Sequence, residues 1–358
     1  MRARATVPIF ETAHQHLGDG VKVWTLDGGF GTDHLAPSTR PSPVPGPGQI
    51  LLRMRAASLN YRDLLMIRGH YNPRQPLPLV PCSDGVGEVI GVGPDVTRFS
   101  VGDRACPIFA QAWLGGPPDV AASRSTLGGP VDGTLQERMV VHEHAAVRPP
   151  THLSDEEAAC LPCAGVTAWR ALATEGGIQA GDTVLTLGTG GVSLFAVQIA
   201  KMLGARVVVT SSQDEKLERA IELGADHGIN YERDRSWGRS TTSWTGGRGV
   251  DLVMELGGAG TLTESLRAVR MGGTVALIGV LAGASGPVPL TRILMRGVRV
   301  QGVFVGSRHD FEALNRALTA HPEVRPQVDR VFDFNAVPEA LEYLSKGLHM
   351  GMVVVRID

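Results

Sequence analysis

The sequence predicts an α/β protein in which a doubly wound parallel sheet is joined to a mainly β domain. Its 358 residues exceed one compact core of roughly 150 residues. Short apolar runs broken by turn residues fill residues 21–147, whereas strand-like and helix-like segments alternate from about residue 153 onward. We therefore place a domain boundary near Pro149 and Pro150.

Composition excludes several classes of function. Hydrophobic residues make up 43% of the chain and charged residues 20%, and the formal net charge is −2, which is typical of a globular protein with a core. Because this charge creates no basic field, we expect neither nucleic acid nor a membrane as a partner. The N-terminal MRARATVPIF lacks the apolar run of a secretory signal, and four cysteines are too few for a disulfide framework, so we expect a cytoplasmic protein.

In the first part of the chain, runs such as ILLRMRAASL and VGEVIGVG are separated by PSPVPGPG, GPDV and VGD. This alternation predicts strands and turns. The pattern changes at Ser154, because Ser154 followed by Glu157 is a capping signature, and AGVTAWRALA continues the predicted helix.

Beyond this helix, β and α segments alternate, which predicts βαβ units around a parallel sheet. The predicted strands are DTVLTLG, ARVVVTSS, VDLVMELG and GTVALIGV. The first three of these strands are separated by two predicted helices, VSLFAVQIAKMLG and DEKLERAIELG. A last helix, PEALEYLSKG, and a last strand, GMVVVRID, could return to the first domain.

The stretch LGTGGVSLF lies between a predicted strand and a predicted helix, where a phosphate-binding turn is expected. Gly188, Gly190 and Gly191 allow a tight turn, so that a dinucleotide diphosphate could rest on the helix N-terminus beside Val192 and Ser193. Ser193 replaces the usual last glycine of the motif, so the strand–turn–helix context carries the prediction.

The end of the strand RVVVTSS is where an adenosine ribose would be recognised. An NAD-binding protein places Asp or Glu there, whereas this chain has Ser211 and Ser212, with Lys216 on the next helix. Hydroxyls and an ammonium bind a 2′-phosphate by charge-assisted hydrogen bonds, so the sequence favours NADPH. The alternative is that Lys216 is an ordinary solvated charge.

Further segments are distinctive together: AASLNYRDLLMIRGHY (56–71), SDGVGEVIGVG (83–93), VGDRA (101–105), LPCAGVTAW (161–169), ELGADHGINY (222–231) and GGRGVDLVMELGG (246–258). With the glycine turn, they resemble the medium-chain dehydrogenases/reductases, specifically the zinc-free quinone oxidoreductase and enoyl reductase branch. The resemblance implies a GroES-like catalytic domain over 1–150, completed by 307–358, a Rossmann NADP-binding domain over 151–306, and an active site in the cleft between them.

In zinc-dependent members of this family, the catalytic metal is held where this chain has Asn60, Ser83 and Cys163. A site with one remaining thiolate cannot hold tetrahedral zinc, and residues 107–147 contain no cysteine for a structural zinc lobe. We therefore expect no metal.

Cys160 and Cys163 form a Cys-x-x-Cys pair, and His142 and His144 are expected on one face of a nearby strand. These residues could form a redox couple or half a metal site. We favour inert thiols, because a metal site requires the two pairs to converge.

Without a Lewis acid, hydride transfer is easiest to a conjugated acceptor, whose charge spreads into an enolate or phenolate that one hydrogen-bond donor can hold. The resemblance places Tyr71 where zinc-free enoyl reductases carry a tyrosine facing the nicotinamide, so Tyr71 is the first candidate proton donor and Tyr61 the second. Asn60 could bond the nicotinamide ribose or the substrate oxygen, or could only stabilise its loop.

Other cofactor contacts follow from the resemblance: Thr167 beneath the nicotinamide, Tyr231 near the adenosine, Gly257 at a strand turn, and Gly279, Val280, Val303 and Phe304 along the nicotinamide pocket. Relatives carry a lysine where this chain has Met352, and Lys346 is the candidate substitute for it.

The segment 298–306, VRVQGVFVG, is predicted to form the edge strand of the parallel sheet and to pair across a two-fold axis in a homodimer. We expect the chain to be an NADPH-dependent reductase of activated C=C bonds or quinones with a small-molecule substrate. Two alternatives are a zinc-free carbonyl reductase or secondary alcohol dehydrogenase, and a nucleotide-binding protein without catalytic role. The loop 109–120 is predicted to shape the substrate pocket.

Overall fold

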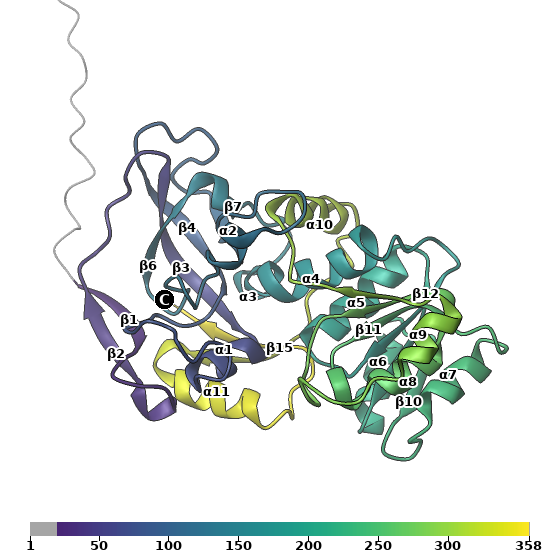
Figure 1. Cartoon of the computed structure of the whole chain (residues 1–358). Helices are drawn as coiled ribbons and strands as arrows, with labels where there is room; N and C mark the ends of the chain where they lie inside the picture. Colours follow the sequence, from purple (N-terminus) through teal and green to yellow (C-terminus); the bar gives the residue numbers. More distant parts are fainter. Residues whose placement is uncertain (1–19, 358) are drawn as a thin grey trace, which may run out of the picture.

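The structure, a computed structural model, describes residues 20–357, which form two bodies that lie side by side (Figure 1). Residues 1–19 and 358 lie outside this description, and so does the N-terminal stretch in which the sequence predicts no secretory signal. The purple and blue strands and the yellow C-terminal elements make up the first body, and the green and teal α/β elements make up the second.

The first body is built on a seven-stranded sheet centred on the long strand β3. One side of β3 pairs with β4, and the other pairs with β6 over 49–53 and with β15 over 56–59. A separate antiparallel pair, β1 and β2, completes the strands of this body. The early elements are β1 (Val21–Leu26), β2 (Leu35–Arg40), β3 (Gln49–Leu59), α1 (Tyr61–Ile67), β4 (Asp84–Val92), β5 (Arg104–Pro107), α2 (Val120–Ser123), β6 (Arg138–His142) and β7 (Ala146–Val147).

The C-terminal part of the chain returns to this sheet. After α10 (Arg308–Ala320), the strand β14 (Val328–Asp333) and the helix α11 (Val337–Ser345) lead to β15 (Met352–Arg356). β15 pairs antiparallel with β3 and parallel with β14. The predicted last helix and the predicted return of the last strand are therefore confirmed.

The second body is a six-stranded parallel sheet in the order β10-β9-β8-β11-β12-β13. Its strands are β8 (Thr183–Leu187), β9 (Arg206–Ser211), β10 (His227–Asn230), β11 (Val250–Glu255), β12 (Val269–Leu277) and β13 (Arg299–Gly302), and its helices are α5 (Gly191–Met202), α6 (Asp214–Glu222), α7 (Trp237–Trp244), α8 (Leu262–Ala268) and α9 (Leu290–Arg296). The strand order reverses between β8 and β11, and ligands bind at such a switch point, outside the carboxyl ends of the strands. The predicted doubly wound fold is confirmed.

The edge strand β13 is shorter than predicted. It ends at Gly302, and Val305, three residues later, has a φ of +43°. A β-branched residue rarely adopts positive φ, so the chain cannot continue as a strand through this point. The predicted strand over 298–306 is therefore wrong in its extent, although its position at the sheet edge is confirmed.

The helix predicted at Ser154 begins there as α3 (Asp155–Ala159), and Ser154 and Glu157 form the predicted capping box. The helical path then continues through a π-helical turn (Leu161–Gly165), α4 (Val166–Trp169) and a second π-helical turn (Arg170–Thr174). π-Helical turns are frequent at functional sites, and this segment lies between the two bodies (Figure 1).

One hydrophobic cluster extends through both bodies. It includes Ile108 and Phe109 of the first body and Val184 and Val207 of the second, all at most 2% exposed. The facing surfaces of the bodies are thereby packed together over part of their length. Within residues 20–357, no helix is long and apolar enough to cross a membrane.

Candidate active site

The three glycines in the turn between β8 and α5 lie in three different structural environments. Gly188 has a φ of +78°, a conformation that favours glycine. A Cβ on Gly190 would project into open space, whereas a Cβ on Gly191 would lie 1.9 Å from Sδ of Met352. The space in front of Gly190 leaves room for a ligand at the N-terminus of α5, where backbone N–H groups lack helical partners.

Ser193 stabilises this turn from behind. Its side chain is buried, and its hydroxyl donates a hydrogen bond of 2.8 Å to the carbonyl of Leu187 at the end of β8. Ser193 therefore ties the first turn of α5 to the strand, which is a structural reason for a serine at the position where the motif usually has glycine.

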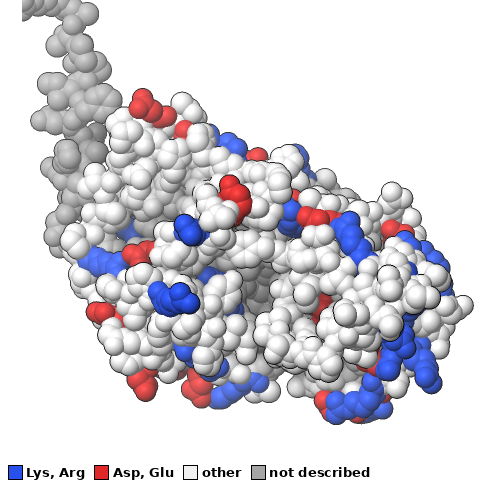
Figure 2. Space-filling view, viewed as in Figure 1, with Lys and Arg blue, Asp and Glu red and all other residues white. Residues whose placement is uncertain are grey.

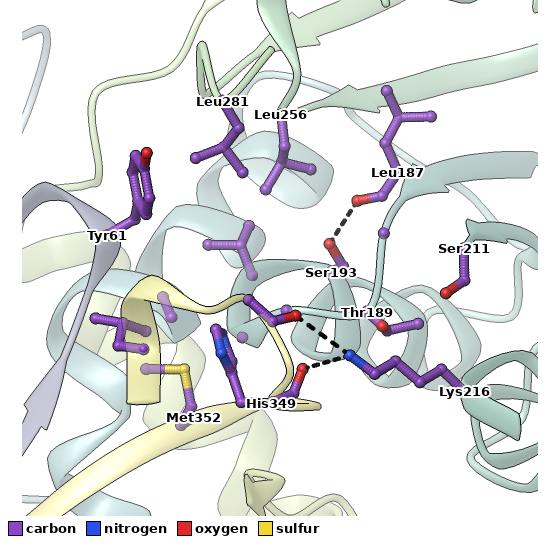
Figure 3. A pocket seen from close by; sticks show the side chains of 18 of the residues that line it. Tyr61, Leu187, Thr189, Ser193, Ser211, Lys216, Leu256, Leu281, His349 and Met352 are labelled. Atoms are coloured by element: carbon purple, nitrogen blue, oxygen red, sulfur yellow. Dashed lines mark hydrogen bonds between the residues drawn. The ribbon is translucent and has the colours of Figure 1, made fainter. Parts of the chain in front are cut away.

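A cavity of about 410 Å³ opens in front of this turn and is called the glycine-turn cavity (Figure 3). It brings together eleven residues of the predicted site: Asn60, Tyr61, Gly188, Gly190, Gly191, Val192, Ser193, Ser211, Ser212, Lys216 and Tyr231. Its described lining contains no Asp or Glu. A cavity without carboxylates at a helix N-terminus suits an anionic group such as a diphosphate.

Lys216 is not an ordinary solvated charge. Its Nζ reaches from α6 across the cavity and donates hydrogen bonds to the carbonyls of His349 (2.9 Å) and Gly347 (3.5 Å) (Figure 3). Partial burial lowers the pKa of Lys216, and the Asp329 carboxylate opposes this shift. Lys216 therefore links the nucleotide side of the cleft to the C-terminal segment of the first body.

The C-terminal segment lines the cavity with residues that the sequence analysis did not single out. His349 lies beside Lys216, and its buried Nδ1 has no hydrogen-bond partner. Burial lowers the pKa of this imidazole, and the Lys216 charge lowers it further. No periodic or spacing signal in the sequence marks His349, because its role depends on how the segment folds back.

The substitution proposed for the missing family lysine is wrong. Lys346 pairs with Glu342 on α11 at 2.8 Å, its side chain is 54% exposed, and it does not line the glycine-turn cavity. Met352 is buried against Gly191 at the position where the family resemblance implies a lysine. An apolar contact between the bodies thus replaces a cation there.

A second cavity, of about 490 Å³, adjoins the first and is called the tyrosine cavity. The two cavities share Asn60, Tyr61, Val192, Leu256 and Leu281. The tyrosine cavity also holds the predicted residues Tyr71, Thr167, Gly279, Val280, Val303 and Phe304. Phe109 of the predicted pocket loop and Cys163 line it too, together with Arg62 and His70, which the sequence analysis did not single out.

Gly257 lies apart from both cavities, in a third cavity of about 530 Å³ that also touches Gly188 and Tyr231. The predicted residues are therefore distributed along one continuous series of hollows. In the face shown in Figure 2, the surface is hollowed between the two bodies, and most atoms around this hollow belong to neither acidic nor basic side chains.

Of the three candidate catalytic residues, Asn60 and Tyr61 line both cavities, whereas Tyr71 lines the tyrosine cavity alone. Tyr71 is 45% exposed and Tyr61 is 42% exposed. Asn60 caps α1: its backbone N–H donates to the Asp63 carboxylate (2.7 Å), and its side-chain amide donates to the Ser58 carbonyl (3.4 Å). Asn60 therefore does stabilise its loop, and it also faces both cavities.

The positions that correspond to zinc ligands surround Asp84. The Asp84 carboxylate accepts hydrogen bonds from the Ser83 hydroxyl (2.7 Å) and from the backbone N–H of Cys163 (2.9 Å). Burial raises the pKa of Asp84 to about 7, and burial also raises the pKa of the Cys163 thiol. One thiol, a hydroxyl and an amide form a poor donor set for zinc.

The alternative metal site is not assembled. Within residues 20–357, no three His, Cys, Asp or Glu side chains form a group that could hold a metal ion. Cys160 is buried and its thiol donates to the Glu156 carbonyl (3.1 Å). The shared strand face predicted for His142 and His144 is also wrong, because β6 ends at His142 and His144 lies in the following 3₁₀ turn, with the ring centres 4.9 Å apart.

The loop 109–120 shapes the tyrosine cavity less than predicted. Only Phe109 lines it directly. Trp113 and Pro118 line a separate hollow together with Arg170, and Trp113 stacks on Phe304 with ring centres 6.2 Å apart. Trp113 therefore acts on the tyrosine cavity through Phe304.

Comparisons with known proteins identify the family. Residues 46–151 match the family described as the alcohol dehydrogenase GroES-like domain, and residues 191–320 match zinc-binding dehydrogenases. A zinc-type alcohol dehydrogenase-like protein of Schizosaccharomyces pombe is 43% identical over 92% of this chain and 96% of its own length. An acryloyl-coenzyme A reductase of Metallosphaera sedula is 30% identical over 87% of this chain and 93% of its own.

A solved structure from Sinorhizobium meliloti 1021, described as a candidate alcohol dehydrogenase, superposes with a TM-score of 0.87 at 41% identity and covers 94% of this chain and 99% of its own. The chain belongs to the alcohol dehydrogenase-like medium-chain dehydrogenase/reductase superfamily. It is an oxidoreductase of that superfamily, with the Rossmann-type sheet and the GroES-like body that its sequence predicts.

Proposed function

We propose that the chain is an NADPH-dependent, zinc-independent reductase of activated C=C bonds or quinones. The observation that carries this proposal is the junction of the two cavities at Asn60, Tyr61 and Val192. One cavity ends on a helix N-terminus with room for a diphosphate, and the other presents a phenol between apolar walls. The similarity to an acryloyl-coenzyme A reductase supports reduction of a conjugated bond.

The preference for NADPH rests on the residues around the adenosine end. Ser211, Ser212 and Lys216 line the glycine-turn cavity without a carboxylate that would repel a 2′-phosphate. We expect NADPH to support turnover with a lower KM than NADH, and Lys216→Ala to raise the KM for NADPH. Equal use of both cofactors, with an unchanged KM in Lys216→Ala, would contradict the assignment.

The nicotinamide, when bound, supplies the hydride. Thr167, Val303 and Phe304 form the wall of the tyrosine cavity against which it would be oriented, and Tyr71 holds a proton at its hydroxyl near the acceptor. In this proposal the Tyr71 phenol donates a hydrogen bond to the forming enolate or phenolate oxygen, and Tyr71 or water delivers the proton.

The decisive experiment tests quinones, enones and ketones as acceptors and measures the oxidation of NADPH with each. With cyclohexenone, we expect reduction of the C=C bond, and with cyclohexanone no turnover. Reduction of the C=O bond in both compounds would favour a carbonyl reductase or secondary alcohol dehydrogenase, which the similarity to alcohol dehydrogenases also supports. NADPH binding without turnover of any acceptor would contradict an enzymatic role.

The proposed independence from zinc conflicts with the name of the matched family, so it needs a direct measurement. Asn60, Ser83 and Cys163 provide one amide, one hydroxyl and one thiol in place of a zinc ligand set. Metal analysis of the purified protein should find far less than one zinc per chain, and chelator treatment should leave turnover unchanged. Stoichiometric zinc that is needed for activity would contradict this part of the proposal.

We also propose a homodimer formed through the edge of the parallel sheet. The outer edge of β13 has no neighbouring strand within the described residues, and the adjacent α9 exposes Leu290, Leu294 and Met295 by 70–78%. Unpaired backbone beside exposed apolar side chains is a surface that a second copy can cover. Light scattering should give twice the 38.0 kDa mass of the chain, and a monomer at all concentrations would contradict the proposal.

A further inference from the structure

Arg62 is a buried cation in the wall of the tyrosine cavity. Its side chain is 9% exposed, and its guanidinium carbon lies 5.0 Å from the ring centre of Tyr71 and 5.0 Å from that of Phe109. The guanidinium therefore contacts two aromatic rings: that of Phe109 in the wall of the cavity, and that of Tyr71, which carries the candidate proton donor.

The orientation of this guanidinium is fixed by its neighbour on α1 and by the segment 127–129. Its Nη1 donates to the carbonyl of Leu127 (2.8 Å) and to the carboxylate of Asp63 (3.3 Å), and its Nη2 donates to the carbonyl of Gly129 (3.4 Å). Its Nε is buried without a partner. An arginine that loses this much hydration without full pairing is costly to the fold, so stability alone does not account for it.

Tyr71, by contrast, is held by few contacts. Its hydroxyl has no hydrogen-bond partner within the described residues, and its ring is almost half exposed. Arg62 provides the planar cationic face on which an aromatic ring can rest. The contact with Arg62 is thus the specific interaction that can determine where the Tyr71 hydroxyl lies in the cavity.

We propose that Arg62 is the positioning residue of Tyr71: the guanidinium, fixed by Asp63 and by the backbone carbonyls of 127 and 129, holds the phenol ring in the tyrosine cavity. The consequence for catalysis rests on the proposed function, in which Tyr71 is the proton donor. The contact itself does not depend on that function and can be tested separately.

The first test uses fluorine NMR of protein labelled with fluorotyrosine, because the chain has only four tyrosines. Tyr71→Phe identifies the Tyr71 resonance. In Arg62→Met this resonance should shift and narrow, while those of Tyr231 and Tyr343 stay in place. Arg62→Lys keeps a cation beside Asp63 and should shift the Tyr71 resonance by an intermediate amount. This variant still tests the contact if Arg62→Met does not fold.

A matched control is available in the same chain. The guanidinium of Arg330 lies 5.3 Å from the ring centre of Tyr343, away from both cavities. Arg330→Met should shift the Tyr343 resonance alone and leave turnover unchanged. If the control responds in this way but the Tyr71 resonance is the same in Arg62→Met, Arg62→Lys and wild type, the proposal is overturned.

The second test is a double-mutant cycle on turnover with the best acceptor. Tyr71→Phe should lower kcat about 100-fold, Arg62→Met should lower it about tenfold with the KM for NADPH unchanged, and the double variant should be no slower than Tyr71→Phe. Multiplicative losses would show that Arg62 acts independently of Tyr71 and would overturn the positioning role. If wild type reduces no acceptor, the proposed function fails, and the NMR experiment alone decides the contact.

Discussion

At the scale of single residues, the glycine turn is determined as much by what packs on it as by what it could bind. Gly190 faces open space, whereas Gly191 faces the Met352 sulfur. Two neighbouring glycines in one motif therefore have different reasons to lack a side chain, one in the cavity and one at the contact between the bodies.

Gly191→Ala should lower the free energy of unfolding by about 1–2 kcal/mol, because the new methyl group overlaps buried Met352. In a chain that already carries Met352→Ala, the same substitution should cost about 1 kcal/mol less, since the space is then free. Urea unfolding of the four proteins measures both values. Additive losses would show that Met352 is not the obstacle.

The sequence predicted the residues whose role follows from local context. The glycine turn, Ser154 with Glu157, and Ser211 with Lys216 are each defined by neighbours a few positions away, and the structure brings the turn, Ser211 and Lys216 to one cavity. Arg62 and His349 were not predicted, because their partners lie far away in the chain: Arg62 bonds the carbonyl of Leu127, 65 positions later.

At the scale of elements, an ion-pair network on β11 ties three strands of the parallel sheet together. Asp251 accepts hydrogen bonds from Arg248 (2.6 and 2.8 Å), from Arg270 on β12 (2.6 Å) and from the backbone N–H of Thr183 on β8 (2.9 Å). Burial would raise the pKa of Asp251, but these donors together lower it to about 2.

Because the folded pKa of Asp251 lies below its ordinary value of 3.8, its contribution to stability is present above pH 4 and is lost as the pH falls toward 2. Asp251→Asn should therefore lower the free energy of unfolding by about 1–3 kcal/mol at pH 7, and the difference from wild type should shrink between pH 4 and pH 2. Denaturant unfolding as a function of pH measures this.

Asp214 is the matched control for this prediction, because it pairs with Arg233, whose side chain is 76% exposed. Asp214→Asn should change the free energy of unfolding by about 0–1 kcal/mol. Equal losses in the two variants at pH 7, or a loss in Asp251→Asn that does not vary with pH, would argue against the network.

Strand positions in the second body were more predictable than strand ends. The apolar runs of β8, β9, β11 and β12 are continuous in sequence because both faces of a parallel sheet are covered. The end of β13 was not predictable in this way, since the apolar pattern continues through Val303 and Val305 while the backbone turns at the positive φ of Val305.

At the scale of the whole molecule, the C-terminal segment joins the two bodies at the cofactor side of the cleft. Gly351 donates its N–H to the carbonyl of Thr189 in the glycine turn (3.0 Å), and Lys216 holds the carbonyls of Gly347 and His349. A ligand in the glycine-turn cavity touches both bodies, because residues of both line it.

Binding of NADPH should therefore slow hydrogen exchange in 347–351 as well as in 188–193. At 100 times the dissociation constant, bound cofactor should add about 2.7 kcal/mol to the free energy of unfolding. Exchange mass spectrometry with and without NADPH measures the pattern. Protection confined to 188–193 would show that the C-terminal segment takes no part in binding.

The hydrophobic cluster that extends from Ile108 and Phe109 to Val184 and Val207 limits how the enzyme can admit its acceptor. A wide hinge motion would expose apolar side chains where this cluster passes from one body to the other, so opening carries a free-energy cost. Entry of the acceptor should instead depend on rotation of rim side chains such as Leu281, which is already in contact with solvent. The side chains at the rim, and not the volume of the tyrosine cavity behind them, then limit the size of the acceptor.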